Sequence, residues 1–291
     1  MNISVQESAA SVSSTAQRRV KQIVRGRATS DGAGVKLTRV IGSAELPDLD
    51  PFLMLDEFGS DKPGDYLAGF PEHPHRGFET VTYMLAGRMR HHDNQGNTGL
   101  LGPGSVQWMT AGRGIMHSEM PEQEDGLMQG FQLWVNLPAR DKMCAPRYQD
   151  IPADAVPLIT PAPGVQVRVL AGSLGDIEGP VRAVATAPVY LDITLQPSTQ
   201  FSVPLPREHS AFAYVFEGEA VIGDETAVQR GQLAVLSTGD AVTLTASKNG
   251  ARMILVAGQP LREPVAKYGP FVMNTQQEIV QAVEDFRAGK F

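Results

Sequence analysis

Short runs in which apolar and polar residues alternate recur along most of the chain. Clear examples are residues 20–25, 35–41, 131–135, 165–170 and 190–195. Because successive side chains of a strand point to opposite faces, this alternation predicts strands with one buried face. The 29 glycines and 21 prolines exceed average usage, and many of them fall between the runs, as turns require. The pattern therefore predicts an all-β protein built from many short strands.

The densest strand signal lies between residues 69 and 135. The β-branched and aromatic run at residues 80–85 ends at Ala86-Gly87, and residues 93–97 (DNQGN) form a turn cluster. We expect the strands that flank this cluster to form a hairpin. His91 and His92 are adjacent, so on a strand they point to opposite faces and at most one can approach a common site. A solvated position on the hairpin is the expected place for both.

The C-terminus departs from the strand pattern and predicts a helix. Residues 275–278 (TQQE) form a capping box, in which the Thr hydroxyl and the Glu carboxylate satisfy backbone N–H groups at the helix start. Ile279, Val283 and Phe286 then follow at spacings that place them on one helical face, and Gly289 ends the pattern. This apolar stripe should pack against a neighbouring sheet.

Two parts of the chain match each other in sequence. Residues 83–87 (YMLAG) match residues 214–218 (YVFEG), and residues 104–112 match residues 231–239 with both terminal glycines in register. An internal repeat of this kind fixes the architecture. Two homologous β-domains are the simplest explanation.

The length and the distribution of prolines suggest where these domains begin and end. A chain of 291 residues is long enough for about two domains. We expect a Ser/Ala-rich disordered tail at 1–16, a first domain at 17–145, a proline-rich connector at 146–164, a second domain at 165–268, and a C-terminal helix within 269–291.

Composition excludes several functional classes. A hydrophobic content of 42% is too high for a disordered chain. The net charge of −7 argues against a general binder of nucleic acids or anionic membranes, which needs a basic surplus. Cys144 is the only cysteine, so no internal disulfide can form. No stretch is long and apolar enough for a membrane span, and the N-terminus lacks the pattern of a secretory signal. We therefore expect a cytoplasmic protein.

Two residue pairs carry candidate metal chemistry. His73 and His75 are two residues apart, as are His117 and Glu119, so each pair lies on one face of a strand. If the two strands are neighbours, three nitrogens and one oxygen converge on one point. Such a set suits a divalent first-row transition metal and is too rich in nitrogen for calcium or magnesium. The alternative is two unrelated histidine clusters on the surface.

Three longer runs resemble one known family. HPHRGFETVTY (73–83), PGSVQWMTAGRGIMHSEMP (103–121) and LWVNLPARDKM (133–143) are similar to the pirin family within the cupin superfamily. The resemblance covers nearly all of the chain after the tail. It implies two cupin-type β-barrels (double-stranded β-helices), with a non-haem metal bound in the N-terminal one.

The resemblance also implies a ligand set, namely His73, His75, His117 and Glu119. In the wider cupin pattern a Glu shortly after the two histidines is commonly the carboxylate ligand, which makes Glu79 a rival. The pirin resemblance favours Glu119, with Glu79 orienting or lining the site.

The same resemblance implies an activity on flavonols such as quercetin. The ring would be cleaved with O2 to give a depside and carbon monoxide, with Fe(II) as the expected metal and Zn, Ni, Cu, Mn or Co as alternatives. Glu119 would be the catalytic base that accepts the proton of the 3-hydroxyl. Two further hypotheses stand beside this one: an iron-binding, redox-sensing regulator that binds a transcription factor or a metabolic enzyme, and a metal-binding barrel for another small enol.

The second repeat lacks the candidate ligands. Alignment of the repeat glycines places Pro204 and Pro206 where His73 and His75 stand, and Leu244 and Ala246 where His117 and Glu119 stand. Proline and aliphatic side chains do not coordinate a divalent cation. We expect one metal per chain.

Overall fold

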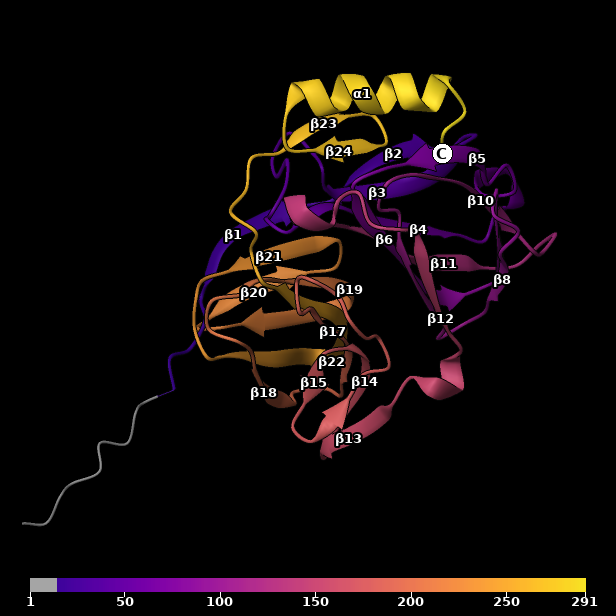
Figure 1. The fold of residues 1–291 in the computed structure, drawn as a ribbon. Coiled ribbons are helices and arrows are strands. Elements are labelled where there is room, and N and C mark those ends of the chain that lie inside the picture. The colour runs from indigo at the N-terminus through magenta and orange to yellow at the C-terminus, as the bar shows by residue number, and fades with distance from the viewer. Residues whose placement is uncertain (1–14) are drawn as a thin grey trace, which may run out of the picture.

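The first half of the chain forms two sheets that face each other (Figure 1). A computed structural model describes residues 15–291, so most of the predicted tail at 1–16 lies outside the described residues. The seven-stranded sheet contains, in spatial order, β12 (Arg147–Ile151), β9 (Val106–Thr110), β6 (Phe78–Ala86), β11 (Met128–Asn136), β4 (Phe52–Ser60), β3 (Val35–Ile41) and β2 (Arg27–Asp31). The four-stranded sheet contains β5 (Phe70–His75), β10 (Ile115–Pro121), β7 (Met89–Asp93) and β8 (Thr98–Leu101).

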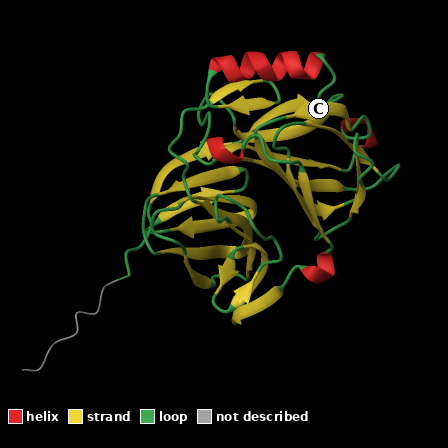
Figure 2. Cartoon of the chain, viewed as in Figure 1, coloured by secondary structure: helices red, strands yellow, loops and turns green. Residues whose placement is uncertain are grey.

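The second half of the chain, together with β1 from near the N-terminus, forms a nine-stranded sheet in the second domain (Figure 2). Its main path contains β1 (Val20–Arg25), β21 (Gln232–Leu236), β19 (Ser210–Ile222), β22 (Ala241–Gly258), β17 (Val189–Leu195), β14 (Val165–Ala171) and β13 (Leu158–Ala162). Two further strands join it at its side, β18 (Gln200–Pro204) and β20 (Thr226–Gln229). Short elements complete the chain: β15 (Ser173–Leu174), β16 (Ile177–Glu178), β23 (Ala266–Tyr268), β24 (Phe271–Met273), and the 3-10 turns η1 (Pro63–Asp65), η2 (Ala139–Asp141) and η3 (Ala153–Ala155).

The repeat found in the sequence is also present in the strand pairing. Tyr83 on β6 pairs with Val106 on β9, and the aligned residues Tyr214 on β19 and Leu233 on β21 pair in the same way. The predicted hairpin is present as well, because β7 and β8 are antiparallel neighbours around residues 93–97. Equivalent registers in the two halves confirm that both domains share one strand plan.

The two domains are joined by a common core and by a reciprocal pair of hydrogen bonds from buried tyrosines. The largest hydrophobic cluster contains side chains from both halves of the chain. The Tyr83 hydroxyl donates to Asp192 of the second domain at 2.6 Å, and the Tyr214 hydroxyl donates to Glu57 of the first. Because both tyrosines are fully buried, loss of either bond would leave a buried polar group unpaired. The domains are therefore held as one unit.

Both ends of the chain cross to the other domain. Strand β1 pairs with β21 of the second domain, although it precedes the whole of the first. Just before it, the buried side chain of Arg18 donates to backbone carbonyls of the second domain, including those of Pro206 and Gly239. At the other end, Phe271 of β24 forms a bridge with Arg76, directly after β5. The residues between 15 and 25 thus belong structurally to the second domain.

The C-terminal helix follows the prediction from the sequence. Helix α1 (Gln276–Arg287) has Thr275 as its N-cap, with both bonds of the capping box to Glu278 present. Ile279 is buried and packs with β23 and β24, so the helix covers this two-stranded sheet at the edge of the first domain (Figure 1). Within residues 15–291, no helix is long and apolar enough to cross a membrane.

Candidate metal centre

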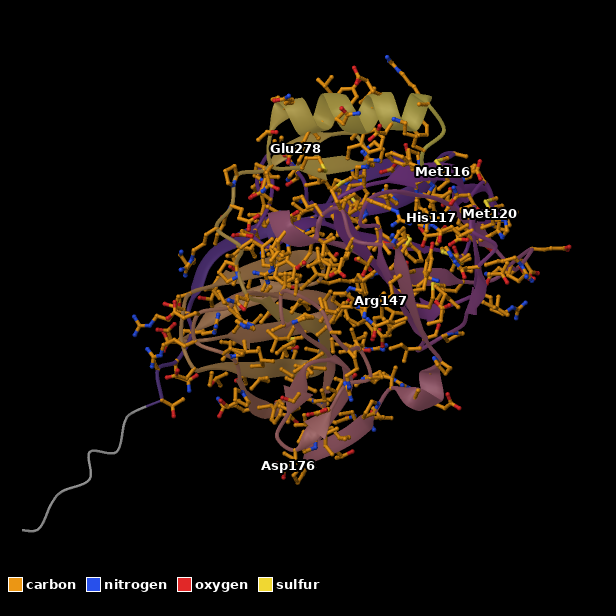
Figure 3. The ribbon with its side chains drawn as sticks, viewed as in Figure 1. Met116, His117, Met120, Arg147, Asp176 and Glu278 are labelled. Carbon is orange, nitrogen blue, oxygen red and sulfur yellow. The ribbon has the colours of Figure 1, made fainter. Side chains whose placement is uncertain are left out.

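Two antiparallel neighbours, β5 and β10, bring the candidate histidines together. His117 on β10 lies opposite His73 on β5, with Met116 and Met120 on either side of it along the strand (Figure 3). His75 lies two residues after His73 and on the same face. One ring nitrogen from each of the three histidines can be chosen so that all lie within 4.8 Å of one another. The three imidazoles thus form one cluster with the spacing that a metal ion requires.

The hydrogen bonding of these imidazoles fits metal ligation. The Nδ1 of His73 lies 2.8 Å from the carbonyl oxygen of Pro71, so this nitrogen carries the proton and Nε2 is left as the ligand atom. The Nδ1 of His75 and both ring nitrogens of His117 are buried without a hydrogen-bond partner among residues 15–291. Buried polar atoms without partners are rare in proteins. A metal ion would satisfy one nitrogen of each of these two rings.

The surroundings also keep the imidazoles of His75 and His117 neutral. Burial lowers the pKa of His75 well below its ordinary value, and the neighbouring His73 lowers it further. The pKa of His117 is lowered well below its ordinary value in the same way, by burial and by the adjacent imidazoles. Neutral imidazole is the form that binds a metal. These two imidazoles can therefore bind a cation without first losing a proton.

Glu119 lies beside the cluster but is not one of the residues that meet the 4.8 Å spacing. Its Oε1 accepts a hydrogen bond from the Thr82 hydroxyl at 2.9 Å, and Oε2 has only a long contact of 3.5 Å with the Gln132 amide. Burial raises the pKa of Glu119, while His73 and the Thr82 bond lower it. The oxygen Oε2 is thus the one available to a metal or to a proton. The role of Glu119 as a ligand stays a prediction.

The rival carboxylate, Glu79, faces a different cavity. Its Oε1 accepts a bond from the Thr110 hydroxyl at 2.6 Å. Glu79 lines a space of about 440 Å³ together with Cys144 and Arg147, whereas His73, His75 and Glu119 line another. This separation favours Glu119 over Glu79 as the fourth ligand.

His91 differs from its predicted place. The sequence predicted a solvated position on the hairpin, but His91 is 1% exposed and its ring centroid lies 5.5 Å from that of His117. His92 points the other way and is exposed. The adjacency of the two residues showed that they face opposite ways. The adjacency did not show which of the two faces inward, because this depends on how β7 pairs with β10.

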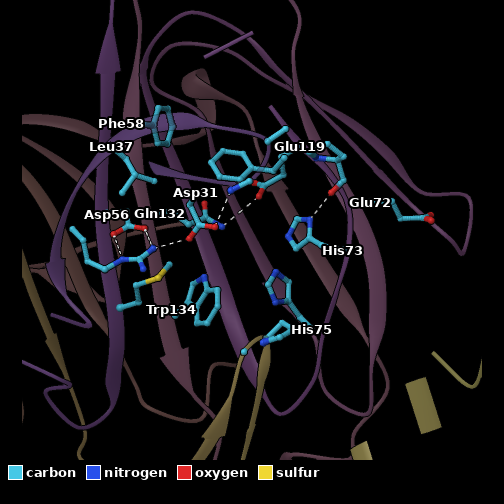
Figure 4. Close-up of a pocket in the computed structure, with 18 residues that line it drawn as sticks. Asp31, Leu37, Asp56, Phe58, Glu72, His73, His75, Glu119, Gln132 and Trp134 are labelled. Carbon is cyan, nitrogen blue, oxygen red and sulfur yellow. Dashed lines mark hydrogen bonds and ion pairs between the residues drawn. The ribbon is translucent and has the colours of Figure 1, made fainter. Parts of the chain in front are cut away.

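A cavity of about 640 Å³ opens beside the histidines. Figure 4 shows His73 and His75 on one side of it and Asp56 on the other, with Trp134 between them. Its walls are formed by the turns at 31–33 and 269–270 and by aromatic and aliphatic side chains. These side chains are Leu37, Met54, Phe58, Phe70 and Trp134. A pocket of this size and composition is suited to a small aromatic molecule.

A row of polar side chains crosses the inner face of the seven-stranded sheet. In the strand register, Arg39 of β3 lies opposite Asp56 of β4, Asp56 opposite Gln132 of β11, and Gln132 opposite Thr82 of β6. The Thr82 hydroxyl also lies 2.7 Å from the Gln132 Oε1. This row, from Arg39 to Thr82, ends at Glu119. Sequence reasoning missed it, because its members lie on four strands and share no local motif.

Comparisons with known proteins show the family to which the chain belongs. Residues 34–135 match the family model described as Pirin, and residues 190–291 match that described as Pirin C-terminal cupin domain. A pirin-like protein of Caulobacter vibrioides is 50% identical over 94% of this chain and 99% of its own length. Pirin of Homo sapiens is 45% identical over 94% of this chain and 93% of its own length.

A solved structure shows the same similarity in three dimensions. The crystal structure of quercetin 2,3-dioxygenase from Acinetobacter baumannii has a TM-score of 0.88 and is 33% identical, and the match covers 95% of this chain and 99% of that one. The family matches and the extent of the identity confirm the resemblance and the fold class that the sequence predicted. This chain belongs to the pirin family, and its two β-domains are cupin domains.

Proposed function

We propose that the protein is a metal-dependent dioxygenase that cleaves a flavonol such as quercetin. The observation that carries the proposal is the cluster of three histidines, two of which burial keeps neutral, beside an aromatic-walled cavity of about 640 Å³. The similarity to a crystallised quercetin 2,3-dioxygenase supports the choice of substrate class.

His73, His75, His117 and Glu119 would hold the metal, which we propose to be Fe(II). A divalent cation there would supply Lewis acidity and, when it can change oxidation state, a path for electrons between flavonol and dioxygen. Histidine binds a metal as neutral imidazole, and Glu119 carries one negative charge when ionised. The loaded site would thus have a net charge near +1, which favours an anionic enolate.

The residues of the chain would bind and deprotonate the flavonol. The carboxylate of Glu119 would accept the proton of the 3-hydroxyl at Oε2, the oxygen that makes only a long contact with Gln132. Thr82 would hold the carboxylate through Oε1. Trp134, Phe58 and Phe70 line the cavity and would pack on the flat rings, which displaces water from the reacting edge.

The reaction balances as the addition of one O2 and the loss of one CO. Both oxygen atoms enter the flavonol, two carbon–carbon bonds of the central ring break, and the carbon that bore the 3-hydroxyl leaves as carbon monoxide. The remaining two rings stay joined through an ester, which is the depside. No additional reductant is required.

A metal exchange tests this proposal. We expect the Fe(II)-loaded protein to consume quercetin and O2 in air, with the His117→Ala variant as an inactive control. If electrons pass through the metal, the zinc form should be inert, since zinc does not change oxidation state. Residual activity of the zinc form would show that the metal acts as a Lewis acid alone. Failure of every metal form to consume any flavonol would overturn the proposal.

A further inference from the structure

We propose that Arg39 and Asp31 form a subsite that recognises hydroxyl groups on the flavonol ring remote from the metal. This inference rests on the proposed function and adds to it a determinant of substrate choice. Both residues line the cavity of the histidines, and Asp31 lies across it from His73 and His75 (Figure 4).

The strand register places this subsite at a useful distance from the histidines. Arg39 and Gln132 lie on strands that are separated by β4 alone. Neighbouring strands are ~4.8 Å apart, so the two backbone positions are roughly 10 Å apart. Gln132 contacts Glu119. A ligand of linked aromatic rings with one edge at Glu119 would therefore extend toward Arg39.

The guanidinium of Arg39 is held rigidly and still has donors available. Its Nε and Nη2 donate to the two oxygens of Asp56 at 2.9 and 2.7 Å, and Nη2 also donates to Asp31 at 2.7 Å. Asp56 is buried, which fixes the pair. None of the hydrogen bonds among residues 15–291 uses Nη1 of Arg39. An arginine has five N–H donors, so two of them remain for a ligand.

The mixture of charges at this end selects a neutral hydroxyl. A hydroxyl accepts from the free Nη1 of Arg39 and donates to the half-exposed carboxylate of Asp31. A carboxylate on the ligand would be repelled by Asp31 and Asp56, whose two negative charges outweigh the single positive charge of Arg39. Two vicinal hydroxyls on an aromatic ring, as on the catechol ring of quercetin, match these donors and acceptors.

Apolar residues flank the polar row on both sides and would hold the ring in plane with it. Leu37 and Phe58 pair across β3 and β4 on one side, and Met54 and Trp134 pair across β4 and β11 on the other. All four line the cavity. A flat ring held between these two apolar pairs would direct the hydroxyl groups at its edge toward Arg39.

Anaerobic binding of two flavonols to the zinc-loaded protein tests the subsite without turnover. Galangin and quercetin share the metal-binding edge, but galangin lacks the catechol hydroxyls. We expect quercetin to bind about tenfold more tightly in isothermal titration calorimetry, and this preference to fall to about twofold in Arg39→Lys and Asp31→Asn. Asp31 is exposed, so its variant should fold even if the Arg39 variant does not. Arg27 lies on β2, as Asp31 does, but outside the cavity. The Arg27→Gln variant should therefore keep the preference for quercetin.

The outcomes separate this inference from the proposed function. If wild-type protein binds both flavonols equally, or if Asp31→Asn and a folded Arg39→Lys keep the full preference for quercetin, the subsite is refuted while the flavonol proposal stands. If neither flavonol binds to the wild-type protein, the flavonol proposal fails and the subsite fails with it.

Discussion

Lys142 joins the metal-binding region to the C-terminal segment, and its replacement should weaken the whole fold. The side chain is 1% exposed. Its Nζ donates to the carbonyls of Gly77 and Val272 at 2.7 and 3.0 Å and to the Asn136 side chain at 2.6 Å. Gly77 follows β5, which carries two of the candidate ligands, and Val272 lies on β24. The perturbation we consider is Lys142→Met, which keeps most of the volume and removes all three bonds.

The expected loss is the difference between two opposing effects. Three buried acceptors would be left unpaired, at about 2 kcal/mol each, or about 6 kcal/mol together. Against this, burial lowers the pKa of Lys142 from 10.5 to about 8, so the buried charge costs about 3 kcal/mol that the methionine avoids. The net loss is about 3 kcal/mol, which corresponds to a fall in Tm of roughly 6 °C for a chain of this size.

Thermal unfolding at two pH values measures this effect. Since the folded pKa of Lys142 lies below the unfolded value, the folded state binds fewer protons between pH 8 and 10.5, and wild-type stability rises with pH in that window. The difference between wild type and Lys142→Met should therefore be larger at pH 10 than at pH 7. Lys248→Met replaces an exposed lysine and should change Tm by about 1 °C or less. An unchanged or raised Tm of Lys142→Met at pH 7 would refute the reasoning.

Three further predictions concern the metal centre and can be checked by elemental analysis of the folded proteins. His75→Ala and His117→Ala should lose the metal, because each removes one ligand of a small set, whereas His91→Ala should keep it; full metal content in both ligand variants would contradict the assignment. Glu119→Gln should lower metal affinity by about tenfold or more, while Glu79→Gln, which faces the other cavity, should not, and the reverse order would exchange their roles. Metal content should saturate at one ion per chain, since Pro204, Pro206, Leu244 and Ala246 replace the ligands in the second domain; two tightly bound ions would show that the repeat alignment is wrong.

Local sequence patterns predicted those parts of the structure that depend on near neighbours. The spacing of two residues between His73 and His75 predicted that both lie on one face of a strand. The capping box at Thr275 predicted the start of α1. The repeat predicted equivalent strand pairs in the two halves, which Tyr83 and Tyr214 confirm. In each case the signal lies within a few residues or in a direct match between two segments.

Features that depend on long-range pairing were not predicted. Strand β1 lies next to the first domain in sequence but pairs with β21 of the second. His91 is buried because β7 pairs with β10, and Lys142 is buried although lysine is usually exposed. The row that includes Arg39 and Gln132 exists only once four strands are in register. No pattern within one segment contains this information.

The ratio of carbon monoxide released to quercetin and O2 consumed tests the central claim most directly. It should be measured on the Fe(II)-loaded protein, with His117→Ala prepared in the same way as the blank. We predict that one CO forms and one O2 disappears for each quercetin, with the depside as the organic product, and that the blank forms none. Loss of quercetin without CO, or equal release by the blank, would contradict the account. If there is no turnover at all, but the metal state alters the binding of a protein partner, the regulator hypothesis would take its place.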